Sequence, residues 1–235
     1  MNNKINEANH KFESEQAIYN IRNKIHFDTY GIIEKEDEKF YLYLNRNLYF
    51  ITIQLSLNFT SDFYTLKRQQ MTLEAIDGFY KWMSSRFIKR SQGRNSKYQP
   101  FLQLFLDNEN SRYCDLKGPI SAAHFHGLLL FHPKTVVCFE RFLRESSPMN
   151  LFPTEVALRT PAFYPIETVT FSRFDPETGP IDNLISYTTK FARNQRFVSG
   201  DDEGIKLLTI HPQISSKLYP FYKSKGCKIW GNYIY

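Results

Sequence analysis

The sequence of 235 residues is poor in cysteine and has no long apolar segment and no low-complexity block. Its cysteines, Cys114, Cys138 and Cys227, form no CxxC pair, and their odd number argues against a disulfide framework. No apolar run approaches the roughly 20 residues of a membrane helix, and the polar N-terminus lacks the apolar centre of a signal peptide. These absences predict a cytoplasmic protein that does not enter a membrane.

The chain is basic and rich in aromatic residues. It has 30 Lys and Arg against 24 Asp and Glu, a net charge of +6 and a pI near 9.1. This balance favours a polyanionic partner, because cations that neutralise phosphates release condensed counterions. The aromatic share of 16% suits a thick core and base stacking equally well, so it does not distinguish between them.

Hydrophobic periodicity predicts a chain of the α+β class. We expect an antiparallel β-sheet with helices packed on one face, of the ferredoxin-like or RNA-recognition type, and an open second face. The predicted domains are an N-terminal accessory arm (1–46, with a short helix), a central domain (47–195) and a basic aromatic C-terminal extension (196–235). The predicted strands are 47–57, 99–106, 120–131 and 168–174, and the predicted helices are 61–89, 133–144 and 181–194.

Two histidines stand in the third predicted strand, SAAHFHGLLLF. Side chains alternate along a strand, so His124 and His126 share a face at a spacing of about 6.5 Å, and both can bind one divalent ion. If the preceding strand pairs antiparallel with this one, the carboxylate of Asp107 lies beside the imidazoles, with Glu109 as the alternative. Such a set suits Mn, Mg or Zn with open positions, while a pair of structural histidines is the competing interpretation.

The last predicted helix carries a candidate nucleophile, Tyr187. It lies outside the apolar stripe of the helix, and Lys190 follows three residues later. A cation near a phenol stabilises phenolate or a phosphate oxyanion, which attack of tyrosine on a phosphodiester requires. Two other tyrosines, Tyr164 and Tyr219, are interpreted as packing residues.

Three segments together resemble the motifs of the HUH endonucleases, and among them the rolling-circle replication initiators of plasmids and small viruses. Residues 50–56 (FITIQLS) resemble the first-strand motif, residues 123–130 (AHFHGLLL) the two-histidine strand, and residues 185–191 (ISYTTKF) the tyrosine helix. The resemblance spans about residues 47–194.

The resemblance implies a metal-dependent endonuclease with a single catalytic tyrosine. His124, His126 and an acidic residue would bind Mn²⁺ or Mg²⁺, Tyr187 would form a 5′-phosphotyrosine link, and Lys190 would neutralise the phenolate or the phosphate. The implied substrate is single-stranded DNA or an origin hairpin, which the enzyme nicks and rejoins. Because no GxxxxGK[ST] loop occurs, we expect a host helicase to unwind the DNA and a host polymerase to copy it.

Several alternatives remain open at this point. Relaxases and single-strand transposases share the chemistry, but relaxases usually carry three histidines and the transposases place Gln where this chain has Lys190. A non-catalytic protein could bind nucleic acid through aromatic residues of an open sheet such as Tyr49 or Phe50, or the histidines could only brace the fold. Plausible phosphate contacts are Lys89, Arg90, Arg94, Lys97, Lys223, Lys225 and Lys228.

Overall fold

The structure is a computed structural model of the whole chain. It describes residues 2–33, 36–56, 66–91, 94–108, 123–146, 155–159, 161–189 and 208–212.

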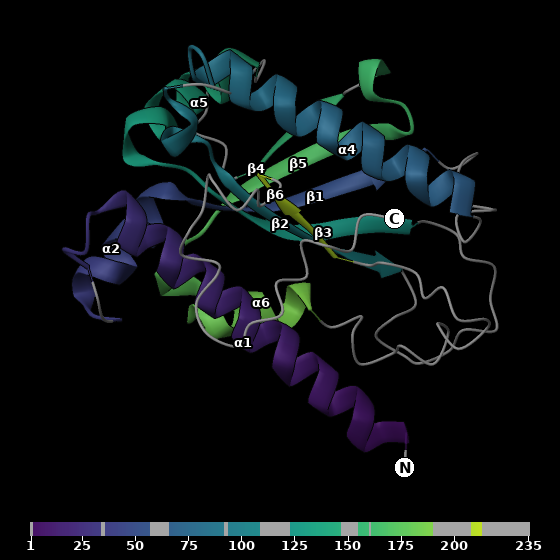
Figure 1. Cartoon of the computed structure of the whole chain (residues 1–235), viewed down its shortest axis with the longest axis horizontal. Coiled ribbons are helices and arrows are strands. Elements are labelled where there is room, and N and C mark those ends of the chain that lie inside the picture. Colours follow the sequence, from purple (N-terminus) through teal and green to yellow (C-terminus); the bar gives the residue numbers. More distant parts are fainter. Residues whose placement is uncertain are drawn as a thin grey trace.

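The described strands form one six-stranded sheet in the order β4-β5-β1-β3-β2-β6 (Figure 1). Every neighbouring pair is antiparallel, so the predicted α+β class with an antiparallel sheet is confirmed. The predicted strands correspond to β1, β2, β3 and β5, whereas β4 and β6 are short strands that pair at the two edges and were not predicted. The bounds are Leu48–Leu55 (β1), Phe101–Asn108 (β2), Ala123–Leu130 (β3), Glu155–Arg159 (β4), Ile166–Arg173 (β5) and Leu208–His211 (β6).

The helices match the prediction in the middle of the chain and differ from it at the N-terminus. The first helix is long, not short, and a second helix occupies part of the predicted arm. The Asp37 side chain caps this second helix, because it accepts a hydrogen bond from the Phe40 N–H. None of the described helices is long and apolar enough to cross a membrane. The bounds are Asn2–Asp28 (α1), Glu38–Asn47 (α2), Leu66–Phe87 (α4), Pro133–Ser146 (α5) and Ile181–Thr188 (α6), with 3₁₀ turns at Ser96–Tyr98 (η1), Pro161–Phe163 (η2) and Pro176–Thr178 (η3).

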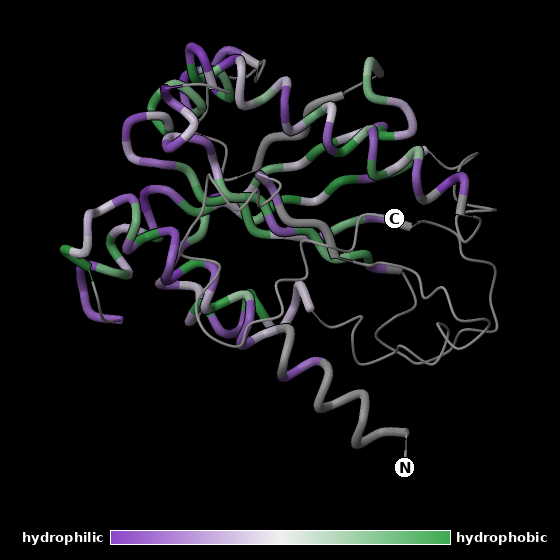
Figure 2. The backbone as a smooth tube through the Cα atoms, in the orientation of Figure 1, coloured by the Kyte–Doolittle hydropathy of each residue, from purple (hydrophilic) through white to green (hydrophobic). Residues whose placement is uncertain are grey.

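One face of the sheet packs against α4 and α5. Tyr49, Ile51 and Ile53 alternate along β1 toward this face, where they join Phe79 of α4 and Phe139 of α5 in one buried cluster. The strands in the middle of the molecule are mostly hydrophobic, and α4 changes between hydrophilic and hydrophobic along its length, as expected for a helix with one buried side (Figure 2).

The second face, which was expected to be open, also carries helices. Ala17, Ile21 and Ile25 of α1 recur every four residues, so they form one apolar side that packs with Leu128 and Leu130 of β3. Residues of α2 and α6 belong to the same cluster, and Figure 1 shows these three helices on the opposite side of the sheet from α4 and α5. Helices therefore lie on both faces, not on one. The division into arm, domain and extension stays a prediction.

A buried ion pair within α1 is hydrogen-bonded to a tyrosine of α2. The Lys24 ammonium donates hydrogen bonds to both Asp28 oxygens at 2.5 and 2.6 Å, and the Tyr43 hydroxyl donates to Asp28 Oδ2 at 2.8 Å. The side chains of Lys24 and Asp28 are fully buried, so removal of one partner would leave an uncompensated charge. The hydrogen bond from Tyr43 holds α2 beside the C-terminal end of α1.

Candidate metal centre and tyrosine

The strand register assembles the candidate site on the helix-covered second face. In the β2–β3 pair Asp107 is directly opposite His124, and in the β1–β3 pair Thr52 is directly opposite His126. Gly127 permits the close approach of β2, because a Cβ atom there would overlap with the backbone carbonyl oxygen of Gln103. The pairing of β2 with β3 thus brings the predicted Asp107, His124 and His126 together, and β1 places Thr52 beside them.

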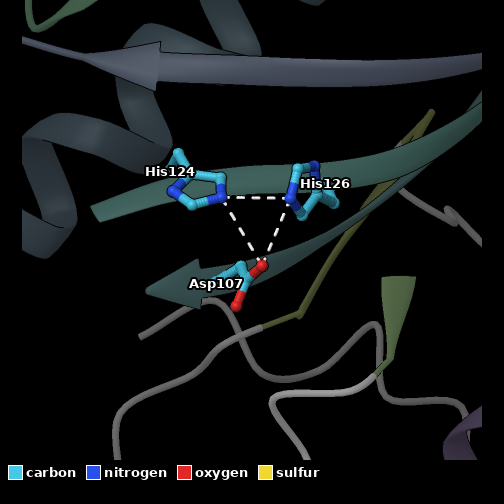
Figure 3. Close-up of side chains that lie close together, drawn as sticks. All are labelled: Asp107, His124 and His126. Atoms are coloured by element: carbon cyan, nitrogen blue, oxygen red, sulfur yellow. Dashed lines mark hydrogen bonds and ion pairs between the residues drawn. The ribbon is translucent and has the colours of Figure 1, made fainter. Parts of the chain in front are cut away.

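The three side chains point their donor atoms toward one another (Figure 3), and these atoms all lie within 4.8 Å of one another. Asp107 Oδ2 lies 3.5 Å from His124 Nε2 and 3.2 Å from His126 Nε2, and the two Nε2 atoms are 3.0 Å apart. Ligand bonds of about 2.1 Å place neighbouring donor atoms about 3.0–3.4 Å apart in octahedral or tetrahedral coordination. The group could therefore hold a metal ion.

Burial also favours a cation at this position. The exposed fractions of the Asp107, His126 and His124 side chains are 1%, 8% and 16%. A carboxylate withdrawn from water is costly unless a positive charge or several donors offset it, and two imidazoles are uncharged when they present their lone pairs. A divalent ion between them supplies that charge, so the donor set fits a metal.

Two residues of β1 hold His126 in place. Thr52 Oγ1 is 3.0 Å from His126 Nδ1, so an Nδ1–H that donates to Thr52 leaves the Nε2 lone pair directed at Asp107 and His124. Phe50 stacks on the His126 ring with a centroid separation of 5.2 Å. The site prediction missed these roles, although strand alternation already places Phe50 and Thr52 on one face.

The phenol of Tyr187 lies beside the histidines. Its hydroxyl oxygen is 3.5 Å from His126 Nε2, and its ring contacts the rings of His126 and Phe50 at centroid separations of 5.1 and 5.8 Å. The side chain is half-buried. The other predicted site residues, Lys190 and Glu109, lie outside the described residues, as do residues 190–194 of the predicted helix.

Helix α1 contacts the helix that carries Tyr187. His10 Nε2 lies 3.3 Å from the Ser186 carbonyl oxygen, and the hydroxyls of Ser14 and Thr189 are 2.9 Å apart. Further along α1, Asn20 donates a hydrogen bond of 3.3 Å to Gln103 Oε1 on the buried face of β2. The N-terminal helix therefore joins the tyrosine helix to the sheet.

Of the two tyrosines that were interpreted as packing residues, the structure describes one. Tyr164 is 58% exposed, so it is not a core residue, because the turn around η2 places it on the surface. Tyr219 lies outside the described residues.

Comparison of the chain with known protein families, with curated proteins and with solved structures finds no match.

Proposed function

We propose that the protein nicks and rejoins single-stranded DNA at a replication origin, with Tyr187 as the nucleophile. The observation that carries the proposal is the 3.5 Å separation between the Tyr187 hydroxyl and Nε2 of His126, a member of the group that could hold a metal ion. If the histidines only braced the fold, a phenol beside their metal-binding nitrogens would have no role. The motif resemblance to rolling-circle initiators supports the same reaction.

The proposed cofactor is Mn²⁺ or Mg²⁺, held by Asp107, His124 and His126. When bound, it supplies a Lewis acid that polarises the scissile phosphate and offsets negative charge in the transition state. Three protein ligands leave coordination positions for substrate, unlike a closed structural site with four. The Thr52 hydroxyl serves this arrangement by keeping Nε2 of His126 unprotonated.

In the proposed reaction the Tyr187 oxygen loses its proton and forms a bond to phosphorus. The bond between phosphorus and the 3′ oxygen breaks, and the 3′ oxygen takes up a proton and leaves as a hydroxyl. The product is a 5′-phosphotyrosine link, which retains the energy of the phosphodiester, so the reverse attack of a 3′-hydroxyl rejoins DNA without ATP. Lys190 is proposed to stabilise the phenolate or the phosphate oxygen.

The proposed partners follow from this reaction. The substrate is single-stranded DNA or an origin hairpin, and a host helicase and a host polymerase unwind and copy the replicon. The enzyme would then contribute only the nick and the covalent link.

A covalent protein–DNA adduct tests the proposal directly. Hairpin oligonucleotides tiled across the DNA around the gene, labelled at the 3′ end, are incubated with the protein and Mn²⁺ and separated on a denaturing gel. We expect the protein to carry the label at one site, and Tyr187→Phe to lower the adduct yield by at least about 10³-fold while DNA binding remains, because the nucleophile is absent.

Tyr164→Phe is the matched control, because this exposed tyrosine lies outside the site, and it should form the adduct normally. An adduct that persists in Tyr187→Phe would place the nucleophile elsewhere. Binding of every hairpin without any adduct would make the protein a non-catalytic binder.

A further inference from the structure

A second cluster of cations and aromatic rings lies at the opposite end of β3 from the metal centre. This basic patch consists of Tyr30, Lys97, Tyr98 and Lys134, and the Lys97 side chain interacts with the side chains of both Tyr30 and Tyr98. The ammonium groups of Lys97 and Lys134 lie 5.1 and 5.2 Å from the Tyr98 ring centroid. Tyr30, in the turn after α1, is 80% exposed, and both lysines are exposed.

The backbone around the basic patch is held in place by buried contacts. The Tyr98 ring meets the buried His132 ring edge to face at 4.7 Å. Gln99 Nε2 donates a buried hydrogen bond of 2.9 Å to the Ser91 carbonyl, and Asn95 Nδ2 donates an exposed hydrogen bond of 2.6 Å to the Lys89 carbonyl. The cations are therefore presented by an ordered turn, and less conformational entropy is lost when they bind a ligand.

The charge of this region is not offset within the described part of the chain. No ion pair there joins Lys97 or Lys134 to a carboxylate, and the same holds for the exposed Lys89, Arg90 and Arg94 of the preceding loop. In contrast, Lys11 and Lys81 are each paired with a carboxylate four residues away. Uncompensated cations on one surface attract a polyanion.

We propose that the basic patch binds single-stranded DNA, with backbone phosphates at Lys97 and Lys134 and an unpaired base on Tyr30. An exposed aromatic ring among cations favours a single strand, because the bases of a duplex cannot stack on it. His132 follows His126 by six residues, so the patch lies about 20 Å from the metal centre along β3. The choice of DNA among polyanions rests on the proposed function.

The test measures binding without catalysis. A fluorescein-labelled dT15 is titrated with the full chain in EDTA, and fluorescence anisotropy gives Kd at several salt concentrations. Each phosphate contact contributes about 0.7 to the slope of log Kd against log salt for a single strand. We expect Lys97→Gln/Lys134→Gln to lower this slope by about 1.4, whereas the control Lys11→Gln/Lys81→Gln, with the same loss of net charge, leaves it unchanged.

A second variant tests the choice of a single strand. Tyr30→Ala should raise the Kd for dT15 about tenfold through lost stacking and leave both the salt slope and the affinity for a 15-base-pair duplex unchanged. Equal slopes in the two double variants would overturn the proposal, and so would a Tyr30→Ala variant that binds dT15 normally. Binding of dT15 in EDTA requires neither the metal nor Tyr187. A failure to form the covalent adduct therefore does not affect this result.

Discussion

At the scale of single residues, His126 is the central member of the candidate site. Its Nε2 atom faces Asp107 and His124, its Nδ1 atom faces Thr52, and its ring contacts those of Phe50 and Tyr187. A histidine can offer a lone pair at only one nitrogen when the other carries the proton. The partner of Nδ1 therefore determines whether Nε2 can bind a metal.

We expect Thr52→Val to weaken Mn²⁺ binding about 10- to 100-fold, because valine has the same shape but cannot accept the Nδ1–H hydrogen bond. Isothermal titration calorimetry measures the affinity, and circular dichroism checks that the fold is retained. His126→Ala serves as a reference in which a ligand itself is removed.

Thr170→Val is the matched control for this substitution. Thr170 pairs with Thr52 from the neighbouring strand β5 and is also half-buried, but β1 separates it from His126. Equal Mn²⁺ affinity in Thr52→Val and Thr170→Val would show that Thr52 does not orient His126.

At the scale of elements, the helix that carries Tyr187 depends on its neighbours. Helix α6 has eight residues, and isolated helices shorter than about 12 residues are marginal in water. Its position is set by packing of Ile181 and Ile185 in the hydrophobic cluster on the second face of the sheet and by the polar contacts from α1. The N-terminal helix thus positions the candidate nucleophile.

Loss of the contact between Ser14 and Thr189 should loosen α6. One hydrogen bond contributes about 1 kcal/mol, so we expect the amides of α6 to exchange about fivefold faster in Ser14→Ala, with unchanged Mn²⁺ affinity. Hydrogen exchange read by mass spectrometry measures this without reference to activity.

Ser85→Ala on α4 is the control, since the Ser85 hydroxyl donates only to the Trp82 carbonyl of its own helix. If α6 exchanges equally fast in wild type and Ser14→Ala, then α1 does not hold the tyrosine helix through this residue.

At the scale of the whole molecule, two histidines outside the site link stability to pH. Burial lowers the pKa of His132 and of His211 to about 4, although nearby Asp28 and Asp77 oppose the shift. His211 stacks on Tyr80 of α4 beside the paired Asp77 and Lys81. His132 also faces Lys24, Lys97 and Lys134, which favour the neutral ring.

The pH dependence follows from the sign of these shifts. The unfolded chain protonates each histidine near pH 6.5 and the folded chain only near pH 4, so the free energy of unfolding decreases as the pH falls through this interval. We expect His211 to account for about 2 kcal/mol of the loss between pH 7.5 and 5. Urea unfolding of wild type and His211→Gln at both pH values measures it, and the variant should lose less.

His26→Gln is the control, because His26 is exposed on α1, and it should lose as much stability as wild type. If His211→Gln also shows the wild-type loss, His211 is not buried in its neutral form.

The sequence alone was enough to predict the elements whose patterns are local. The periods of 2 and 3.6 residues marked β1, β2, β3, β5, α4 and α5, and strand alternation placed His124 and His126 on one face. The short strands β4 and β6 have too few residues for a clear period, and their edge pairing depends on distant strands.

Only the tertiary structure decided which groups meet. Strand register is a pairing between segments far apart in sequence, so the sequence named Asp107 with Glu109 as the alternative, and only the assembled sheet sets Asp107 opposite His124 and Thr52 opposite His126. The same holds for α1, whose apolar side packs over a face that was expected to be open and whose polar residues contact α6. Local sequence patterns determine which side chains share one face of a strand or helix. The packing of the whole chain determines which of these faces come into contact.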